Sequence, residues 1–225
     1  MTLTLYQHCI RATCELRAIF QRDYSWITLC KGQVTPSYAK TSVKKCTDIL
    51  LVSTISELTE TATFTCENLF AFCFVLKTAT SSYVDLFAAK SGYGDVILQH
   101  LTDFSGATPI YLNAIQSAKW FYFDAGGFAF RTTHKYHRPR VRDGCAEMYF
   151  VKADSDEELY QNYQRDRLIT EHLYLYMRII DTTGEARIIY KRMFFDVCQK
   201  IAKHFEKSSV PNYIRKNMKK VMKLS

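Results

Sequence analysis

The order of strand-like and helix-like segments limits the fold of this chain more than any other feature of its sequence. Apolar, β-branched and aromatic runs such as 63–77 alternate with segments such as 95–104, whose apolar residues recur at helical spacing. No regular succession of strand, helix and strand repeats along the chain, as a doubly wound parallel sheet would require. The sequence therefore predicts an α+β fold with an antiparallel sheet packed by helices.

Two hairpins in the C-terminal half are expected to supply strands to this sheet. The first covers 120–131, where the glycine pair Gly126-Gly127 separates two aromatic runs and suits a turn. The second joins 168–180 to 186–193, and its side chains alternate between two faces. A strand at 147–152 and a short acidic helix are expected between the two hairpins.

The N-terminal half is less regular. Residues 3–21 have apolar residues at helical spacing, with a strand as the alternative, and residues 24–30 predict a strand. We expect a polar connection over 33–47 and a short helix over 83–89. The segment Gly92-Tyr-Gly94 follows that helix and is interpreted as too short and too poorly placed for a phosphate-binding loop.

The C-terminal end carries almost all of the net charge. Residues 200–225 contribute +7 of the formal net charge of +8. On a helix, residues 213–224 divide into an apolar arc and a cationic arc. The cations of that arc are Arg215, Lys216, Lys219, Lys220 and Lys223. We expect residues 1–207 to form one globular α+β domain, and 208–225 to form a basic amphipathic tail helix.

Three interpretations of this tail compete. Its apolar arc docks on the rest of the protein and leaves the lysines as a solvated face, which is the usual role of such charge runs. Alternatively, the arc inserts into a membrane of acidic lipid, which attracts clustered cations. In the third interpretation the arc stays packed while the cations contact a phosphate backbone. A helix that binds in the groove of a partner protein has the same pattern.

A second basic segment lies at 131–142, which contains no acidic residue and is expected to be a loop because of Pro139. Its cations are Arg131, Lys135, Arg138, Arg140 and Arg142. Guanidinium groups bind phosphates through two parallel hydrogen bonds. Alternatively, nearby acids such as Asp143 and Glu147 neutralise this segment. The two basic segments together predict an anion-binding surface if they share one face.

Motifs for catalysis are weak. His100 and His172 are each followed by Leu and a hydroxyl-bearing residue, and paired histidines of this kind act as general acid and base in phosphoesterases. This pair is the alternative function, although Tyr174 stands where such enzymes have Ser or Thr. No cysteine or histidine spacing predicts a metal site, and no cofactor is expected.

These observations predict a non-enzymatic structural or binding protein. We expect its partner to be nucleic acid, such as RNA, or an anionic lipid surface. A viral matrix-type component or a self-assembling lattice protein fits this composition, because exposed aromatic residues enrich contact surfaces and favour a homo-oligomer. The sequence shows neither a secretory signal nor an apolar run long enough to span a membrane. We therefore expect a cytoplasmic or nuclear protein, peripheral to any membrane it contacts.

Overall fold

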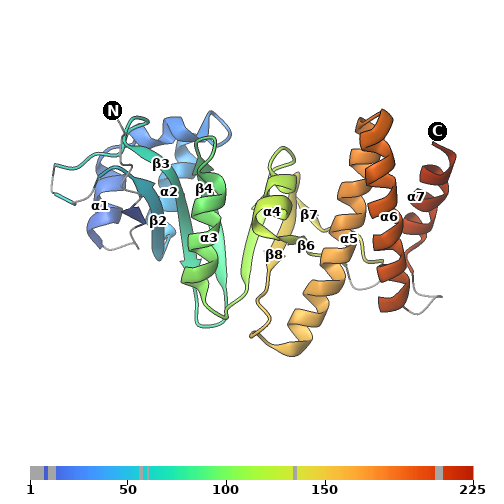
Figure 1. Ribbon diagram of the computed structural model, residues 1–225. Coiled ribbons are helices and arrows are strands. Elements are labelled where there is room, and N and C mark those ends of the chain that lie inside the picture. Colours follow the sequence, from blue (N-terminus) through green and yellow to red (C-terminus); the bar gives the residue numbers. More distant parts are fainter. Residues whose placement is uncertain are drawn as a thin grey trace. The chain divides into compact units, whose positions relative to one another are not determined.

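The computed structural model describes residues 8–9, 14–55, 58–59, 61–133, 136–205 and 210–224. The chain divides into two compact units, Met1–Asn113 and Ala114–Ser225. The first unit runs from blue to green in Figure 1, and the second from green to red. Each unit is described by itself.

The first unit places helices and strands in an α+β arrangement. Its strands are β1 (His8–Cys9), β2 (Asp48–Ser53), β3 (Leu69–Lys77), β4 (Ser82–Ala89) and β5 (Ile110–Ala114, which ends at the start of the second unit). Its helices are α1 (Cys14–Arg22), the 3₁₀ helix η1 (Ser25–Cys30), α2 (Pro36–Lys45) and α3 (Gly94–Ser105). Strands β1 to β4 are antiparallel neighbours in chain order, whereas β5 pairs in parallel with β4. Helix α3 forms the crossover between these parallel strands.

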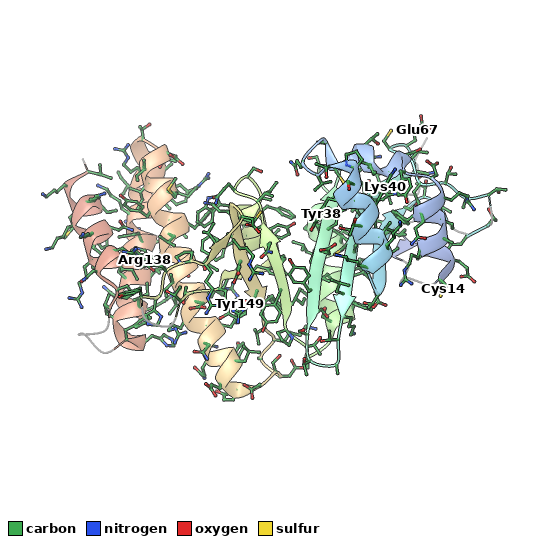
Figure 2. All side chains as sticks on the ribbon, turned by 180° about the vertical axis from the view of Figure 1, so that it is seen from behind. Cys14, Tyr38, Lys40, Glu67, Arg138 and Tyr149 are labelled. Atoms are coloured by element: carbon green, nitrogen blue, oxygen red, sulfur yellow. The ribbon has the colours of Figure 1, made fainter. Side chains whose placement is uncertain are left out.

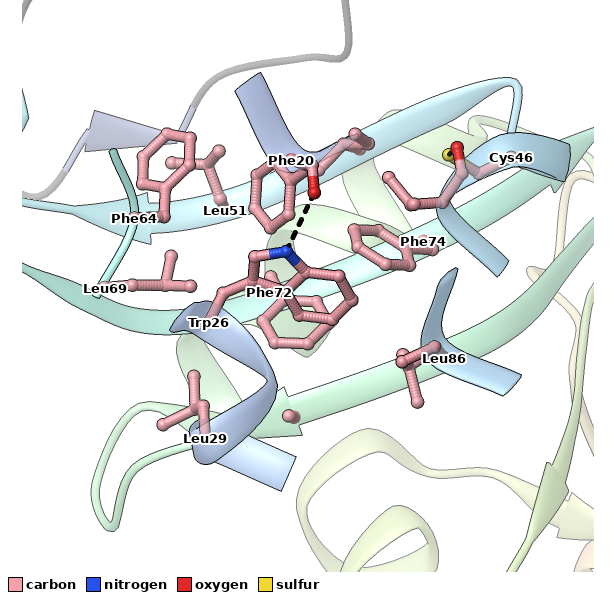
Figure 3. Packing of buried hydrophobic residues seen from close by; sticks show 14 of the residues in the cluster. Phe20, Trp26, Leu29, Cys46, Leu51, Phe64, Leu69, Phe72, Phe74 and Leu86 are labelled. Atoms are coloured by element: carbon pink, nitrogen blue, oxygen red, sulfur yellow. Dashed lines mark hydrogen bonds between the residues drawn. The ribbon is translucent and has the colours of Figure 1, made fainter. Parts of the chain in front are cut away.

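Aromatic packing fills the core on one face of this sheet. Phe20 and Trp26 come from α1 and η1, and both contact Phe72 and Phe74 of β3 at ring-centroid distances of 5.2–6.0 Å. The Trp26 indole N–H donates to the Phe20 carbonyl at 3.0 Å, so the largest side chain is buried with its polar atom satisfied (Figure 3). Every residue of β2 is buried, because helix α3 packs against β2, β3 and β4 as well.

The second unit combines short strands with three long helices. Its elements are α4 (Lys119–Gly126), β6 (Ala129–Phe130), β7 (Val141–Arg142), β8 (Cys145–Phe150), α5 (Glu157–Asp181), α6 (Gly184–His204) and α7 (Asn212–Lys223). Strands β6 and β7 both pair antiparallel with β8. Helices α5, α6 and α7 pack together around buried residues that include Ile169, Phe194 and Ile201. The structure thus confirms the expected α+β class, with sheet strands packed by helices.

Both expected hairpins of the C-terminal half are wrong. Residues 119–126 form helix α4, and Gly127, with φ +68°, ends that helix in the left-handed region where glycine is also favoured in hairpin turns. Residues 168–180 and 186–193 lie within helices α5 and α6. The buried residues of α5 include Ile169, His172, Leu175 and Ile179, which recur at helical spacing.

Of the other expected elements, some are wrong and some are confirmed. Residues 25–30 form the 3₁₀ helix η1 and 83–89 belong to strand β4, so the strand expected over 24–30 and the helix expected over 83–89 are wrong. The polar connection expected over 33–47 is wrong, because residues 36–45 form helix α2. This helix begins after Thr35, whose hydroxyl accepts from the Tyr38 N–H at 3.2 Å. Helices at 95–104 and 213–224 are confirmed by α3 and α7. The boundary expected after residue 207 lies at residues outside the described part, and that division of the chain stays a prediction.

Candidate functional site

The connection from β4 to α3 combines a glycine turn with the start of a helix. Gly92 has φ +84°, and a Cβ placed on it would meet no atom within 4 Å. Tyr93 is the N-cap of α3 and makes no side-chain hydrogen bond to the first turn. The first N–H groups of a helix have no partner within the helix, and they carry a partial positive charge. In other proteins, phosphates bind at helix N-termini that follow a strand and a glycine-rich turn.

Two aromatic residues and a lysine order this connection. The Lys90 N–H donates to the Phe70 carbonyl at 2.7 Å, and its ammonium nitrogen lies 4.2 Å from the centre of the Phe70 ring. The rings of Phe70 and Tyr93 are 4.8 Å apart. A strand, and not the expected helix, precedes Gly92-Tyr-Gly94.

A β-bulge distorts β4 in the middle of its length. Phe74 pairs with Leu86 and Val75 pairs with Val84, which leaves Asp85 without a partner residue on β3. The Tyr38 hydroxyl donates to the Asp85 carbonyl at 3.0 Å, and Oδ1 of Asp85 lies 3.2 Å from the same hydroxyl. Burial, together with the negative charge of Asp85, raises the pKa of Tyr38 to about 12. Tyr38 projects from α2 and is labelled in Figure 2.

The parallel pairing of β4 and β5 places further polar groups beside this bulge. Tyr83 of β4 pairs with Tyr111 of β5, and the Asn113 side-chain amide donates to the Tyr83 hydroxyl at 3.0 Å. Ligands of α/β sheets bind beyond the carboxyl ends of parallel strands, which is where the β4–α3 connection lies. Asp85 stands four residues before the end of β4, or about 13 Å along an extended strand.

The two basic segments of the second unit touch each other. The Tyr213 hydroxyl of α7 donates to the His137 carbonyl at 2.8 Å, which joins the tail helix to the 131–142 segment. Arg131, Arg138 and Arg142 are exposed and Arg140 is partly buried, while Lys135 lies outside the described residues. Arg142 lies 3.9 Å from Glu147, so one nearby acid does face this segment, as the alternative interpretation expected. Figure 2 labels Arg138.

Part of the apolar arc of α7 is packed inside the second unit. Ile214 and Val221 have no exposed surface and belong to the core formed with α5 and α6. All five cations of the helix are exposed: Arg215, Lys216, Lys219, Lys220 and Lys223. This arrangement fits the docked interpretation of the tail, and insertion of the arc into lipid would require α7 to leave the core.

The phosphoesterase pair is wrong for a physical reason. His172 has no exposed surface, and its ring packs 4.6 Å from that of Phe194. Its Nδ1 lies 3.5 Å from the Cys198 sulfur, and burial lowers the pKa of His172 to about 4. A neutral, enclosed imidazole cannot reach a substrate, so His100 and His172 do not form a catalytic pair. Within the described residues, no cluster of three or more His, Cys, Asp and Glu side chains is arranged to hold a metal ion.

No protein-family model matches the chain, and no curated protein is significantly similar to it. Solved structures show a distant likeness. A putative GNAT-family acetyltransferase from Bacteroides thetaiotaomicron has a TM-score of 0.41 and 13% identity, covering 72% of this chain and 98% of its own.

Two further solved structures have similar values. One, from Corynebacterium glutamicum, is described as histone acetyltransferase HPA2 and related acetyltransferase (TM-score 0.37, 14% identity, 65% of this chain and 97% of its own). Escherichia coli ElaA has a TM-score of 0.38 and 13% identity, covering 63% of this chain and 98% of its own.

These findings correct the function expected from composition. Two of the three structures are described as acetyltransferases, and none of the three descriptions names a viral, structural or RNA-binding protein. The expectation of a non-enzymatic, viral matrix-type or lattice protein is therefore wrong. The likeness is too distant to assign the chain to a family. No described helix is both long enough and apolar enough to cross a membrane.

Proposed function

We propose that the first unit is an acyltransferase that binds an acyl-coenzyme A and transfers its acyl group to an amine. One observation carries the proposal: β4 leads from the bulged Asp85 to a glycine turn and the uncapped start of α3. A ligand held there would have a phosphate at the helix start and a reactive group about 13 Å away along the strand. An acyl thioester on a long pantetheine arm ending in a pyrophosphate has this layout.

The residues present fit such a ligand. Space is open around Gly92, whose Cβ position meets no atom within 4 Å, so phosphate oxygens can approach the backbone. The N–H groups of the first turn of α3 supply donors and a favourable dipole. Lys90 adds a positive charge to the same connection. The bound thioester would supply an activated acyl carbon.

Asp85 and Tyr38 have distinct roles in this proposal. The exchange forms a C–N bond, breaks a C–S bond and moves one proton from nitrogen to sulfur. Asp85 of β4 is the general base: its carboxylate accepts the proton from the amine. The Tyr38 hydroxyl holds the bulged residue in place through its hydrogen bond to the Asp85 carbonyl, and its pKa, raised to about 12, keeps it a hydrogen-bond donor even at alkaline pH.

The test is a transfer assay with acetyl-coenzyme A and a set of amines. The loss of thioester absorbance measures the rate of acyl transfer. We expect turnover that Asp85→Asn lowers by about 10²-fold, the usual contribution of a positioned acid or base. The matched control is Asp103→Asn, which removes an exposed carboxylate from α3 in the same unit. Equal activity of the two variants would remove Asp85 from the mechanism, and no turnover with any acyl donor would overturn the proposal.

The finer predictions about partners remain proposals. An anionic partner, nucleic acid or acidic lipid, would contact the cations of 131–142 and α7, and the Tyr213–His137 hydrogen bond supports a shared location for the two segments. We expect Lys216→Gln/Lys219→Gln/Lys220→Gln to weaken binding to duplex DNA or acidic vesicles across a salt series. Affinity that depends on neither salt nor these lysines would contradict the proposal. Light scattering tests self-association, and cell fractionation tests the proposed cytoplasmic or nuclear location.

A further inference from the structure

A cavity in the second unit lies between α4 and α5. Its volume is about 410 Å³, which is within the range of small-molecule sites. Aromatic rings of Trp120, Phe121 and Tyr174 line it, and the Trp120 and Tyr174 rings lie 5.5 Å apart. All of its lining residues belong to the second unit, so it is separate from the β4–α3 connection of the first unit.

The charged groups of the cavity favour a cation. Asp124 and Asp181 both line it and both are exposed. The salt bridges found among the described residues involve neither carboxylate, although Asp124 interacts electrostatically with Arg178. The cavity also contains one positive group, Arg178, whose guanidinium donates to the Tyr190 hydroxyl at 3.0 Å and lies 5.2 Å from the centre of the Tyr190 ring and 5.9 Å from that of Tyr174. Outside the lining, the Lys119 ammonium lies 5.0 Å from the centre of the Trp120 ring.

Aromatic faces beside carboxylates attract positively charged organic groups. An ammonium over the face of Trp or Tyr gains electrostatic stabilisation from the ring, and a nearby carboxylate adds a charge-assisted hydrogen bond. We propose that this cavity binds a protonated amine carried on an aromatic or other apolar group. The apolar part would lie against Trp120 and Phe121, and the ammonium would face Asp124 and Asp181.

Tryptophan fluorescence is a direct probe of this site. The chain has two tryptophans, and Trp26 is fully buried in the core of the first unit, whereas Trp120 lines the cavity. We would titrate the full chain with 2-phenylethylamine, its uncharged analogue 2-phenylethanol and its anionic analogue 3-phenylpropionate. The proposal predicts a saturable change in emission with the amine, and weaker binding of both analogues. Trp120→Phe should abolish the change.

Variants of the two acids test the role of charge. Asp124→Asn and Asp181→Asn should each weaken amine binding by roughly fivefold, the upper range for a solvent-exposed ion pair. Asp196→Asn is the control, because it removes an exposed carboxylate from α6 outside the cavity lining. Equal binding of the alcohol and the amine, tighter binding of the carboxylate, or no saturable response would each overturn the proposal. Unchanged circular dichroism of the variants shows that they fold.

Discussion

Asp166 on α5 is a buried carboxylate whose removal has a predictable effect on stability. It is 3% exposed, its two oxygens accept three hydrogen bonds, and its Oδ1 lies 3.7 Å from Nε of Arg165. The donors are the Thr132 N–H at 3.1 Å, the Thr132 hydroxyl at 2.7 Å and the Tyr149 hydroxyl at 3.0 Å. The carboxylate thus ties α5 both to β8 and to the start of the basic 131–142 segment.

The expected loss of stability follows from these hydrogen bonds. Hydrogen bonds to a charged group contribute about 1.5–3 kcal/mol each, and a buried donor left without an acceptor loses its solvation as well. Asp166→Ala removes the acceptor of all three donors at once. We expect the free energy of unfolding to fall by about 4 kcal/mol, since the lower end of that range applies when water enters the space left by the carboxylate.

Urea unfolding followed by circular dichroism measures this loss, and hydrogen exchange of residues 129–150 localises it. Tyr149→Phe and Thr132→Val each remove a hydroxyl donor while keeping the carboxylate, so each should cost about 1–2 kcal/mol. Asp196→Ala, which removes an exposed acid from α6, should change stability by less than about 0.5 kcal/mol. A loss below about 1 kcal/mol for Asp166→Ala would refute the reasoning.

Two further predictions concern α7 and His172. Ile214→Ala should lower the free energy of unfolding in urea by about 2–5 kcal/mol, because Ile214 is fully buried. Met222→Ala is the control and should change it very little, because Met222 is 63% exposed on the same helix. Equal effects of the two substitutions would mean that α7 is not docked. Burial lowers the pKa of His172 to about 4. As the pH falls below about 6.5, the imidazole therefore takes up a proton in the unfolded state before it does so in the folded state. The free energy of unfolding should drop by about 3 kcal/mol between pH 6.5 and 4. His172→Gln should lack this part of the pH dependence, and an unchanged pH profile in that variant would contradict the assignment.

Helices with a clear amphipathic pattern were predictable from the sequence. The tail helix has its apolar and basic residues on separate arcs, and the buried Ile214 and Val221 lie on the apolar arc. The expected hairpins failed for a different reason. Leu173 and Leu175 fit the alternation of a strand, but burial within α5 follows a longer period through Ile169, His172 and Ile179. Local alternation alone does not distinguish the two structures.

The candidate site could be predicted only in part. Gly92-Tyr-Gly94 was visible in the sequence, but residues 83–89 were expected to be helical, and a glycine turn between two helices does not cradle a phosphate. In the structure 82–89 form a strand, so Gly92 lies in a turn between that strand and the start of helix α3. Asp85 carries no local signal, because its bulge depends on the register between β4 and β3. Its hydrogen bond with Tyr38 joins residues 47 positions apart.

The most direct test of the proposed function is calorimetric binding of coenzyme A to the full chain, compared with pantetheine, which lacks the phosphates. The matched variants are Gly92→Glu and Gly32→Glu: both glycines have positive φ (+84° and +72°) and open space around them, but only Gly92 lies before α3. We predict that coenzyme A binds more tightly than pantetheine, that Gly92→Glu abolishes this preference and that Gly32→Glu preserves it. Equal affinity for the two compounds, or equal effects of the two substitutions, would contradict a phosphate site at the start of α3.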